Sequence, residues 1–303
     1  MSRTITVGID GSPESRAAAE WAAREARLRD LPVKLVQVWE PVPEPIAQAP
    51  LLGAETHQHW TERVPRETAD GLRLRHPGVE VTTEQITGTP GEVLAAQARD
   101  AEMLVLGSRG LGGLGGFMVG SVSLSVVAHA ERPVVLVRAG EQAADEHEPD
   151  PMGIASAATA FRPVLLALDV EGPDAALVEF AFDAAARRSA PLRVLHAWSP
   201  PPYYAYAYGM AFDPEINRSL AQTDADALTD VLRPWRQKFP DIEVVAESRF
   251  GSPAVELVEA SREASLVVVG RRIRRSPLGS HIGHVTHALL HHSTTPVAVV
   301  AHG

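Results

Sequence analysis

The chain of 303 residues is long enough for two domains, each with its own hydrophobic core. Hydrophobic residues make up 45% of it and aromatic residues 5%, which favours parallel sheets of Val, Leu and Ile covered by helices. The formal net charge of -10 argues against general nucleic-acid binding, and the absence of cysteine excludes disulfides, thiolate catalysis and Cys-ligated zinc.

The N-terminus, MSRTITVGID, passes from a few polar residues into a strand and has no charged-then-apolar signal pattern. No stretch approaches the roughly 18 uninterrupted apolar residues of a spanning helix. We therefore expect a soluble, cytoplasmic protein that contacts neither membrane nor nucleic acid.

One domain pattern occurs twice in the chain. The offset between matching segments grows from 159 (Asp10 to Asp169) to 163 (Gly107 to Gly270), so the second copy has four extra residues, which we expect in its middle loop. The matched segments are ITVGID at 5–10 with VLLALD at 164–169, VKLVQVW at 33–39 with LRVLHAW at 192–198, and MLVLG at 103–107 with LVVVG at 266–270.

Each copy is predicted to run strand, helix, strand, long loop, helix, strand, helix, strand, helix, strand. The strands are short, continuous apolar runs, as expected for a parallel sheet that helices cover on both faces. The alternation implies right-handed crossovers and a doubly wound α/β sheet, which binds ligands at the carboxyl ends of its strands.

Proline marks three predicted helix starts. Ser12, Thr89 and Ser252 each precede a proline and are expected to cap the helix with their hydroxyl groups. Glu92, three residues after Thr89, is expected to complete a capping box there.

The expected domains are residues 1–139 and 162–303, with 140–161 as a linker. The segment between them is acidic, contains proline and lacks a sustained period. The long loops at 40–56 and 199–214 differ between the copies. The second contains PPPYYAYAYGMAF, which we interpret as a lid on its own domain rather than as a partner-binding patch.

The most informative stretch is Gly107–Ser123, GSRGLGGLGGFMVGSVS, which follows a buried strand and opens a helix. Its backbone N–H groups converge where an anion can bind at a helix N-terminus. The hydroxyl groups of Ser121 and Ser123 can donate to phosphate oxygens, and Arg109 can add positive charge.

Two familiar phosphate-binding motifs fit this stretch poorly. Residues 110–115 match the dinucleotide fingerprint G-x-G-x-x-G, but they follow the fourth strand of the domain, and Glu131 precedes the next strand instead of ending it. The P-loop pattern G-x-x-x-x-G-K-[ST] is absent from the sequence.

The pattern Gly107-x2-Gly110-x9-Gly120-Ser121 resembles the nucleotide-binding signature of the ATP-binding class of universal stress proteins. The resemblance covers both halves outside the linker. It implies two tandem flavodoxin-like domains, similar to adenine nucleotide α-hydrolases. Each would be a five-stranded parallel sheet of order 3-2-1-4-5 with helices on both faces.

The same resemblance implies that the first domain binds ATP with a divalent cation, Mg²⁺. The alternative is a glycine-rich surface loop without a ligand. The implied contacts are Gly8, Ile9 and Asp10 by the adenosine, Val38 beside the adenine, Gly107, Arg109 and Gly110 along the ribose and phosphates, and Gly120, Ser121, Val122 and Ser123 at the terminal phosphates.

The second copy departs from this signature. It keeps Gly270 and Gly283, but Ile273 replaces the middle glycine and lies inside the basic run 271–275, and His284 replaces the serine. A β-branched residue obstructs a backbone that needs positive φ, so we expect poor ATP binding there. Because Asp169 and Thr286 are kept, residual binding or binding of another anion stays open.

Histidines gather near the end of the chain. His284, His287 and His291 lie on one face of the last predicted helix. A metal site would need further ligands that converge on that face. A partly exposed helix face or a pH-responsive contact is the interpretation we favour.

Three functions are compatible with this sequence. A regulatory nucleotide-binding module is favoured over a slow ATPase, because the glycine-rich loop offers no base or water-positioning group. A ligand-free scaffold that acts only by dimerisation is the third. The resemblance also implies that Val134–Val137 and Val297–Val300 pair within the chain as a pseudo-dimer, with a homodimer and an unidentified protein partner both possible.

Overall fold

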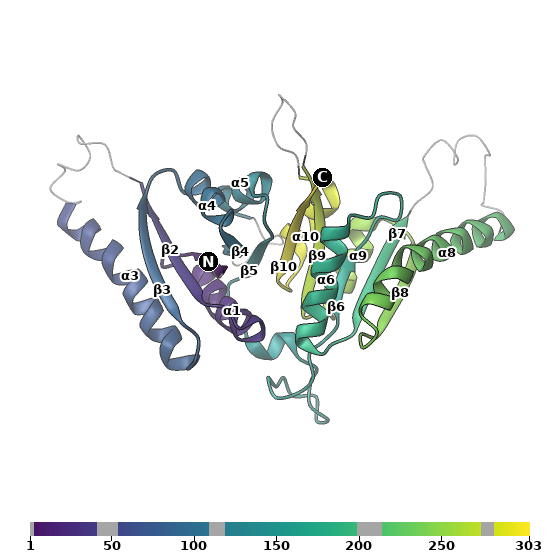
Figure 1. Cartoon of the computed structure of the whole chain (residues 1–303), viewed down its shortest axis with the longest axis horizontal. Coiled ribbons are helices and arrows are strands. Elements are labelled where there is room, and N and C mark those ends of the chain that lie inside the picture. Colours follow the sequence, from purple (N-terminus) through teal and green to yellow (C-terminus); the bar gives the residue numbers. More distant parts are fainter. Residues whose placement is uncertain (1–2, 41–53, 109–118, 199–213, 274–281) are drawn as a thin grey trace. The chain divides into compact units, whose positions relative to one another are not determined.

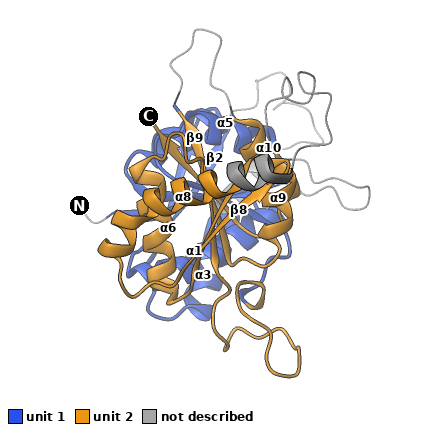
Figure 2. Cartoon of the chain, turned by 90° about the vertical axis from the view of Figure 1, so that its right-hand side faces the viewer, with its two compact units in different colours: residues 1–143, 273–282 blue, residues 144–272, 283–303 orange. Residues whose placement is uncertain are grey.

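The computed structural model describes residues 3–40, 54–108, 119–198, 214–273 and 282–303. The chain divides into two compact units, coloured separately in Figure 2. Unit 1 comprises residues 1–143 and 273–282, and unit 2 comprises residues 144–272 and 283–303. Within the described ranges, no helix combines the length and the hydropathy needed to cross a membrane.

Unit 1 contains a parallel sheet of order β3-β2-β1-β4-β5 (Figure 1), which confirms the predicted order 3-2-1-4-5. Its strands are β1 (Thr4–Gly8), β2 (Val33–Trp39), β3 (Val81–Thr87), β4 (Ala101–Ser108) and β5 (Val134–Arg138).

Helices cover both faces of this sheet. Helix α1 contacts α3, and α4 contacts α5, as right-handed crossovers require. The central strands are buried on both faces, which explains their continuous apolar sequences, whereas edge strand β3 is polar and mostly exposed. The helices are α1 (Pro13–Arg29), α3 (Ala54–Arg75), α4 (Pro90–Ala98) and α5 (Ser121–His129).

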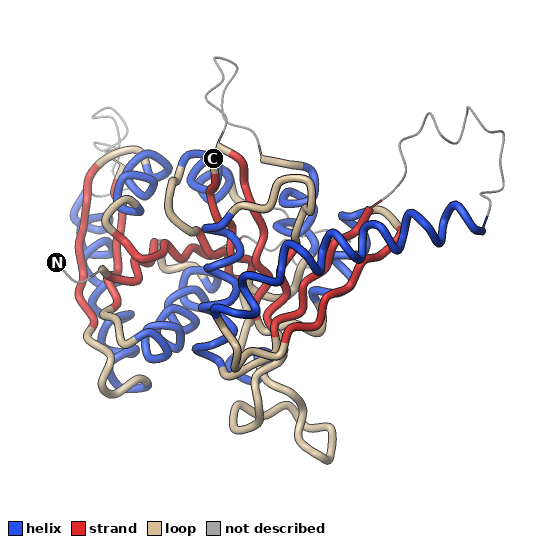
Figure 3. Tube along the Cα trace, turned by 45° about the vertical axis from the view of Figure 1, so that its right-hand side comes forward, coloured by secondary structure: helices blue, strands red, loops and turns tan. Residues whose placement is uncertain are grey.

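Unit 2 repeats this architecture with the sheet order β8-β7-β6-β9-β10 (Figure 1). Figure 3 colours the helices and strands along the Cα trace. Its strands are β6 (Val164–Ala167), β7 (Leu192–Trp198), β8 (Val244–Phe250), β9 (Leu266–Arg272) and β10 (Val297–His302). Its helices are α6 (Ala175–Arg188), α8 (Pro214–Lys238), α9 (Pro253–Ser261) and α10 (His284–His292).

We predicted that the extra residues of the second copy lie in its middle loop. Most of them instead lengthen a helix. Helix α8 has 25 residues and its counterpart α3 has 22. Residues 215–233 contain neither glycine nor proline to break the helix, which allows this extension.

The predicted helix caps are confirmed in part. The Ser12 hydroxyl accepts a hydrogen bond from the Ser15 N–H at 3.1 Å, and prolines open α1, α4 and α9. Thr89 and Ser252 make no capping hydrogen bond, so the capping box at Thr89 was a wrong prediction. Their ψ angles are 119° and 117°, against 160° at Ser12, which does cap its helix.

The segment between the two repeats is more ordered than its composition indicated. The Glu148 N–H donates to the Ala160 carbonyl at 2.8 Å, and the rings of His147 and Phe161 are in contact, with their centroids 4.0 Å apart and their planes tilted by 32°. Glu146 and His147 are buried within unit 2, where the Arg188 guanidinium lies 5.7 Å from the Phe161 ring. These contacts give the segment from residue 144 to residue 161 a defined structure as part of unit 2.

Two arginines and a glutamate link strands β7 and β8. Arg193 Nε donates to Glu247 Oε1 at 2.6 Å, and Arg249 Nη2 donates to Glu247 Oε2 at 2.6 Å. Burial alone would raise the pKa of Glu247, but the hydrogen bonds from Arg193 and Arg249 outweigh it and hold that pKa below the usual 4.5.

Replacing Glu247 with Gln should destabilise unit 2 at neutral pH by about 1–2 kcal/mol, because charge-assisted hydrogen bonds are lost. Since the folded-state pKa is lowered, the ionised carboxylate stabilises the fold above pH 5, and this contribution is lost as the pH falls through the folded-state pKa. Urea unfolding at pH 7 and at pH 3 measures the difference between wild type and variant. A difference that does not shrink at pH 3 would contradict this assignment.

Candidate functional site

The turn between β1 and α1 places Asp10 at the carboxyl end of the sheet. Its Oδ1 accepts hydrogen bonds from the Ser12 N–H at 2.9 Å and the Ser12 hydroxyl at 2.5 Å. Gly11 has a φ of 84°, which a side chain would strain. Asp169 of unit 2 makes the same local bond, to the N–H of Glu171 at 3.1 Å. Both carboxylates are exposed at the same position in their units.

Gly107 lies where strand β4 and helix α1 approach most closely. A Cβ atom at this position would lie 2.6 Å from the backbone carbonyl carbon of Glu14. At Gly8, a Cβ would lie 2.6 Å from Leu106 Cδ2. Packing alone therefore requires glycine at Gly107 and disfavours a side chain at Gly8, whatever ligand the unit binds.

A hydroxyl group ties the start of α5 to the end of β4. The buried Ser123 side chain donates to the Gly107 carbonyl at 3.0 Å, and Thr286 of unit 2 donates to the Gly270 carbonyl at 2.9 Å. The Ser123 proton is thus directed to the fold and not toward a phosphate. Any contribution of Ser123 to an anion site then comes from its backbone N–H.

The start of α5 can accept an anion. Its N-cap residue, Gly120, has no side chain, and no side-chain hydrogen bond caps the helix. The first backbone N–H groups of a helix have no intrahelical partner and carry partial positive charge. Ser121 and Val122 are exposed beside them. Arg109 and Gly110, which the sequence assigned to the ribose and phosphates, lie outside the described residues.

The residues assigned to the nucleoside lie on β1 and β2. Ile9 continues β1, because its N–H donates to the Val36 carbonyl at 2.9 Å. Val38 is half-buried in β2, where it pairs with Ile86 of β3. The sheet pairing and the Ser123–Gly107 bond therefore bring all the described candidates to the carboxyl edge of the unit 1 sheet.

Unit 2 keeps the backbone frame but changes the side chains. Gly283 precedes α10 with φ −59° and ψ 152°, close to the −66° and 150° of Gly120, and His284 is the first residue of the helix. A Cβ at Gly270 would lie 2.7 Å from His302 Nε2, so a side chain there is disfavoured unless the His302 ring shifts. Ile273, which replaces the middle glycine, is 36% exposed.

The late histidines contact one another on α10. The rings of His287 and His291 stack with their centroids 4.3 Å apart. Among the residues that the structure describes, no three His, Asp or Glu side chains gather as a metal site would require.

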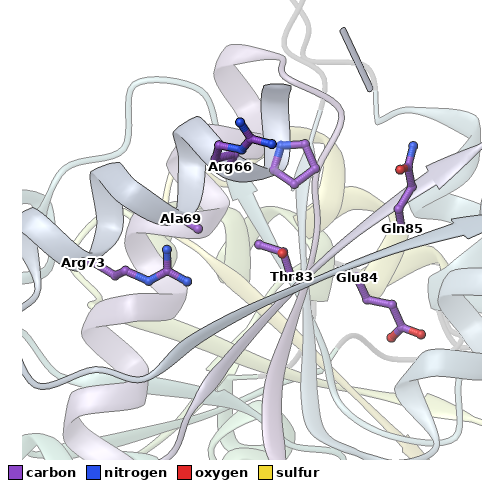
Figure 4. Close-up of a pocket in the computed structure, with 7 residues that line it drawn as sticks. Arg66, Ala69, Arg73, Thr83, Glu84 and Gln85 are labelled. Carbon is purple, nitrogen blue, oxygen red and sulfur yellow. The ribbon is translucent and has the colours of Figure 1, made fainter. Parts of the chain in front are cut away.

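A groove of about 360 Å³ runs between α3 and edge strand β3 (Figure 4). Arg73 on its wall donates to the Asp70 carboxylate at 2.9 Å and to the Val81 carbonyl at 2.7 Å, and Glu84 pairs with Lys34 at 2.5 Å. Arg73 and Glu84 therefore bind other residues of unit 1. The lining residues are Pro65, Arg66, Ala69, Arg73, Thr83, Glu84 and Gln85.

The sequence analysis missed one buried polar residue near the site. Gln37 is 8% exposed, and its Oε1 atom is buried without a hydrogen-bond partner. Leaving a buried acceptor unsatisfied costs about 1–3 kcal/mol. A polar residue inside the apolar run VKLVQVW was the signal that could have revealed it.

Known proteins are similar to this chain in sequence and in fold. The sequence model of the universal stress protein family matches residues 1–138 and 160–301. A universal stress protein of Mycolicibacterium smegmatis is 33% identical over 306 residues, which cover 98% of this chain and 96% of that protein. The crystal structure of a universal stress protein from Archaeoglobus fulgidus covers 100% of both chains at 18% identity, with a TM-score of 0.68. A second structure from A. fulgidus, in complex with dAMP, covers 44% of this chain and 96% of its own at 24% identity, with a TM-score of 0.33.

Replacing Gly107 with Ala should destabilise the protein by about 1–3 kcal/mol, because the new methyl group would overlap the backbone of Glu14. Gly283→Ala is the matched control. A Cβ there meets nothing within 4 Å, so the only expected cost is the weaker preference for Ala than for Gly at the N-cap of α10, up to about 1 kcal/mol. Urea unfolding of the two variants without ligand measures both effects, and equal effects would contradict the packing role of Gly107.

Proposed function

Because the chain belongs to the universal stress protein family, we propose that unit 1 binds an adenine nucleotide at the carboxyl edge of its sheet. The nucleoside would lie over the ends of β1 and β2, near Ile9, Asp10 and Val38. The phosphates would lie at the start of α5, against Gly120 and the backbone N–H groups of residues 121–123.

One observation carries this proposal. The start of α5 has no side-chain cap, and the Ser123–Gly107 hydrogen bond holds it at the carboxyl end of β4, beside the strand that ends near Asp10. A helix start that is held in place and has exposed residues is a favourable position for a phosphate group. The carboxyl edge of a doubly wound sheet is also where such folds bind their ligands.

The nucleotide we propose is ATP with Mg²⁺. The first phosphate-binding residues by sequence, Arg109 and Gly110, lie outside the described residues, and the start of α5 supplies the described part of the phosphate site. Mg²⁺ is commonly held by the phosphates themselves with few protein ligands.

Regulation by occupancy fits this site better than catalysis. Efficient phosphoryl transfer needs a group that orients or deprotonates the attacking water. Of the described residues at the start of α5, Ser121 and Ser123 are weak bases, and Ser123 is hydrogen-bonded to Gly107. We therefore propose a stress-response regulator whose bound and free states present different surfaces to a protein partner.

Calorimetry with Mg-ATP on the intact chain tests this proposal. Wild type should bind about one nucleotide per chain. Gly120→Val should weaken binding at least tenfold, because a branched side chain obstructs the start of α5. Gly283→Val is the matched control in unit 2, where the glycine has nearly the same backbone angles, and it should leave the affinity and stoichiometry unchanged.

The other possible outcomes of this titration distinguish between one site, two sites and no nucleotide site. Two nucleotides per chain would show that unit 2 also binds, against our expectation. No binding by a folded protein would reject the nucleotide function and favour a ligand-free scaffold. Where binding is confirmed, a phosphate-release assay separates a regulator from a slow ATPase.

A further inference from the structure

Gln37 offers a hydrogen-bonding group that the fold of unit 1 does not use. The residue is 8% exposed, and its buried amide oxygen has no donor within the described structure. Its neighbour in sequence, Val38, is the residue assigned to the adenine. A buried acceptor without a donor beside a candidate binding site points to a donor supplied from outside.

The sheet pairing fixes the direction of this side chain. In the parallel ladder, Gln37 pairs with Gln85 and Leu35 pairs with Thr83. Paired residues project from the same face, and Figure 4 shows Thr83 and Gln85 along the groove beneath α3. Gln37 therefore projects toward the α3 side of the sheet, near the carboxyl end of β2 and beside Ile9 of β1.

Unit 2 provides an internal comparison for this position. The residue at the same place in the repeat is His196, which is also buried. Its Nδ1 atom donates to the carbonyl of Leu168, the counterpart of Ile9, at 3.0 Å. The unit with the altered signature thus satisfies its buried polar group internally, whereas the unit with the complete signature leaves its buried amide oxygen without a hydrogen-bond donor.

We propose that Gln37 recognises the base, and that its amide hydrogen-bonds the amine-bearing edge of adenine. This inference rests on the proposed nucleotide function of unit 1. A glutamine amide presents an acceptor and a donor side by side, which complements the exocyclic amine of adenine and the adjacent ring nitrogen. The base must then lie over the ends of β1 and β2 with its amine edge toward α3.

Calorimetry with two nucleotides tests the assignment. The first is Mg-ATP and the second is the magnesium complex of purine riboside triphosphate, which lacks only the exocyclic amine. Wild type should bind ATP about 3- to 10-fold more tightly, the effect of one net hydrogen bond. Gln37→Leu should bind both nucleotides equally within about twofold, because its ribose and phosphate contacts are unchanged.

His196→Leu is the matched control in unit 2. It should keep the wild-type preference for ATP but lower the melting temperature, since the Leu168 carbonyl loses its donor. Gln37→Leu should not lower the melting temperature, because it removes no hydrogen bond from the fold.

Three results would overturn the assignment and leave the nucleotide function standing. They are a wild type without preference between the two nucleotides, a Gln37→Leu variant that keeps the preference, and a Gln37→Leu variant destabilised as much as His196→Leu. Failure of wild type to bind either nucleotide would reject the nucleotide function itself, and the base assignment with it.

Discussion

The hydrogen bond from the Ser123 hydroxyl to the Gly107 carbonyl determines where the candidate site can form. It joins the first turn of α5 to the last residues of β4 and so fixes the helix start at the carboxyl edge of the sheet. Gly107 also permits the close approach of α1, which follows β1 and Asp10. Strand end, helix start and the β1–α1 turn therefore depend on one short stretch of backbone.

The two units separate what the fold requires from what a ligand requires. Unit 2 keeps the hydroxyl–carbonyl bond through Thr286 and Gly270, and it keeps the Asp169 turn and the uncapped helix start at Gly283. These features belong to the architecture. The differences lie in side chains, with His284 in place of Ser121 and His196 in place of Gln37. Ligand specificity is therefore best sought at those positions.

Much of the fold was predictable from the sequence, because continuous apolar runs and their repetition specify buried parallel strands. The strand order and the family are confirmed. Local hydrogen bonds were harder to predict. Thr89 does not cap α4, although the sequence pattern predicts a capping box there. The hydrogen bond of Ser123 and the unpaired amide oxygen of Gln37 depend on packing between segments that are distant in sequence. The pairing of Val134–Val137 with Val297–Val300 and the contacts of Arg109 and Gly110 stay predictions.

We propose that one nucleotide binds at the carboxyl edge of the unit 1 sheet. Assigned backbone amide NMR spectra of the intact chain, recorded with and without Mg-ATP, test it most directly. We expect large shifts at Asp10, Gly107 and Ser121, and small shifts at their counterparts Asp169, Gly270 and His284. Equal shifts in both sets, or shifts confined to unit 2, would contradict it.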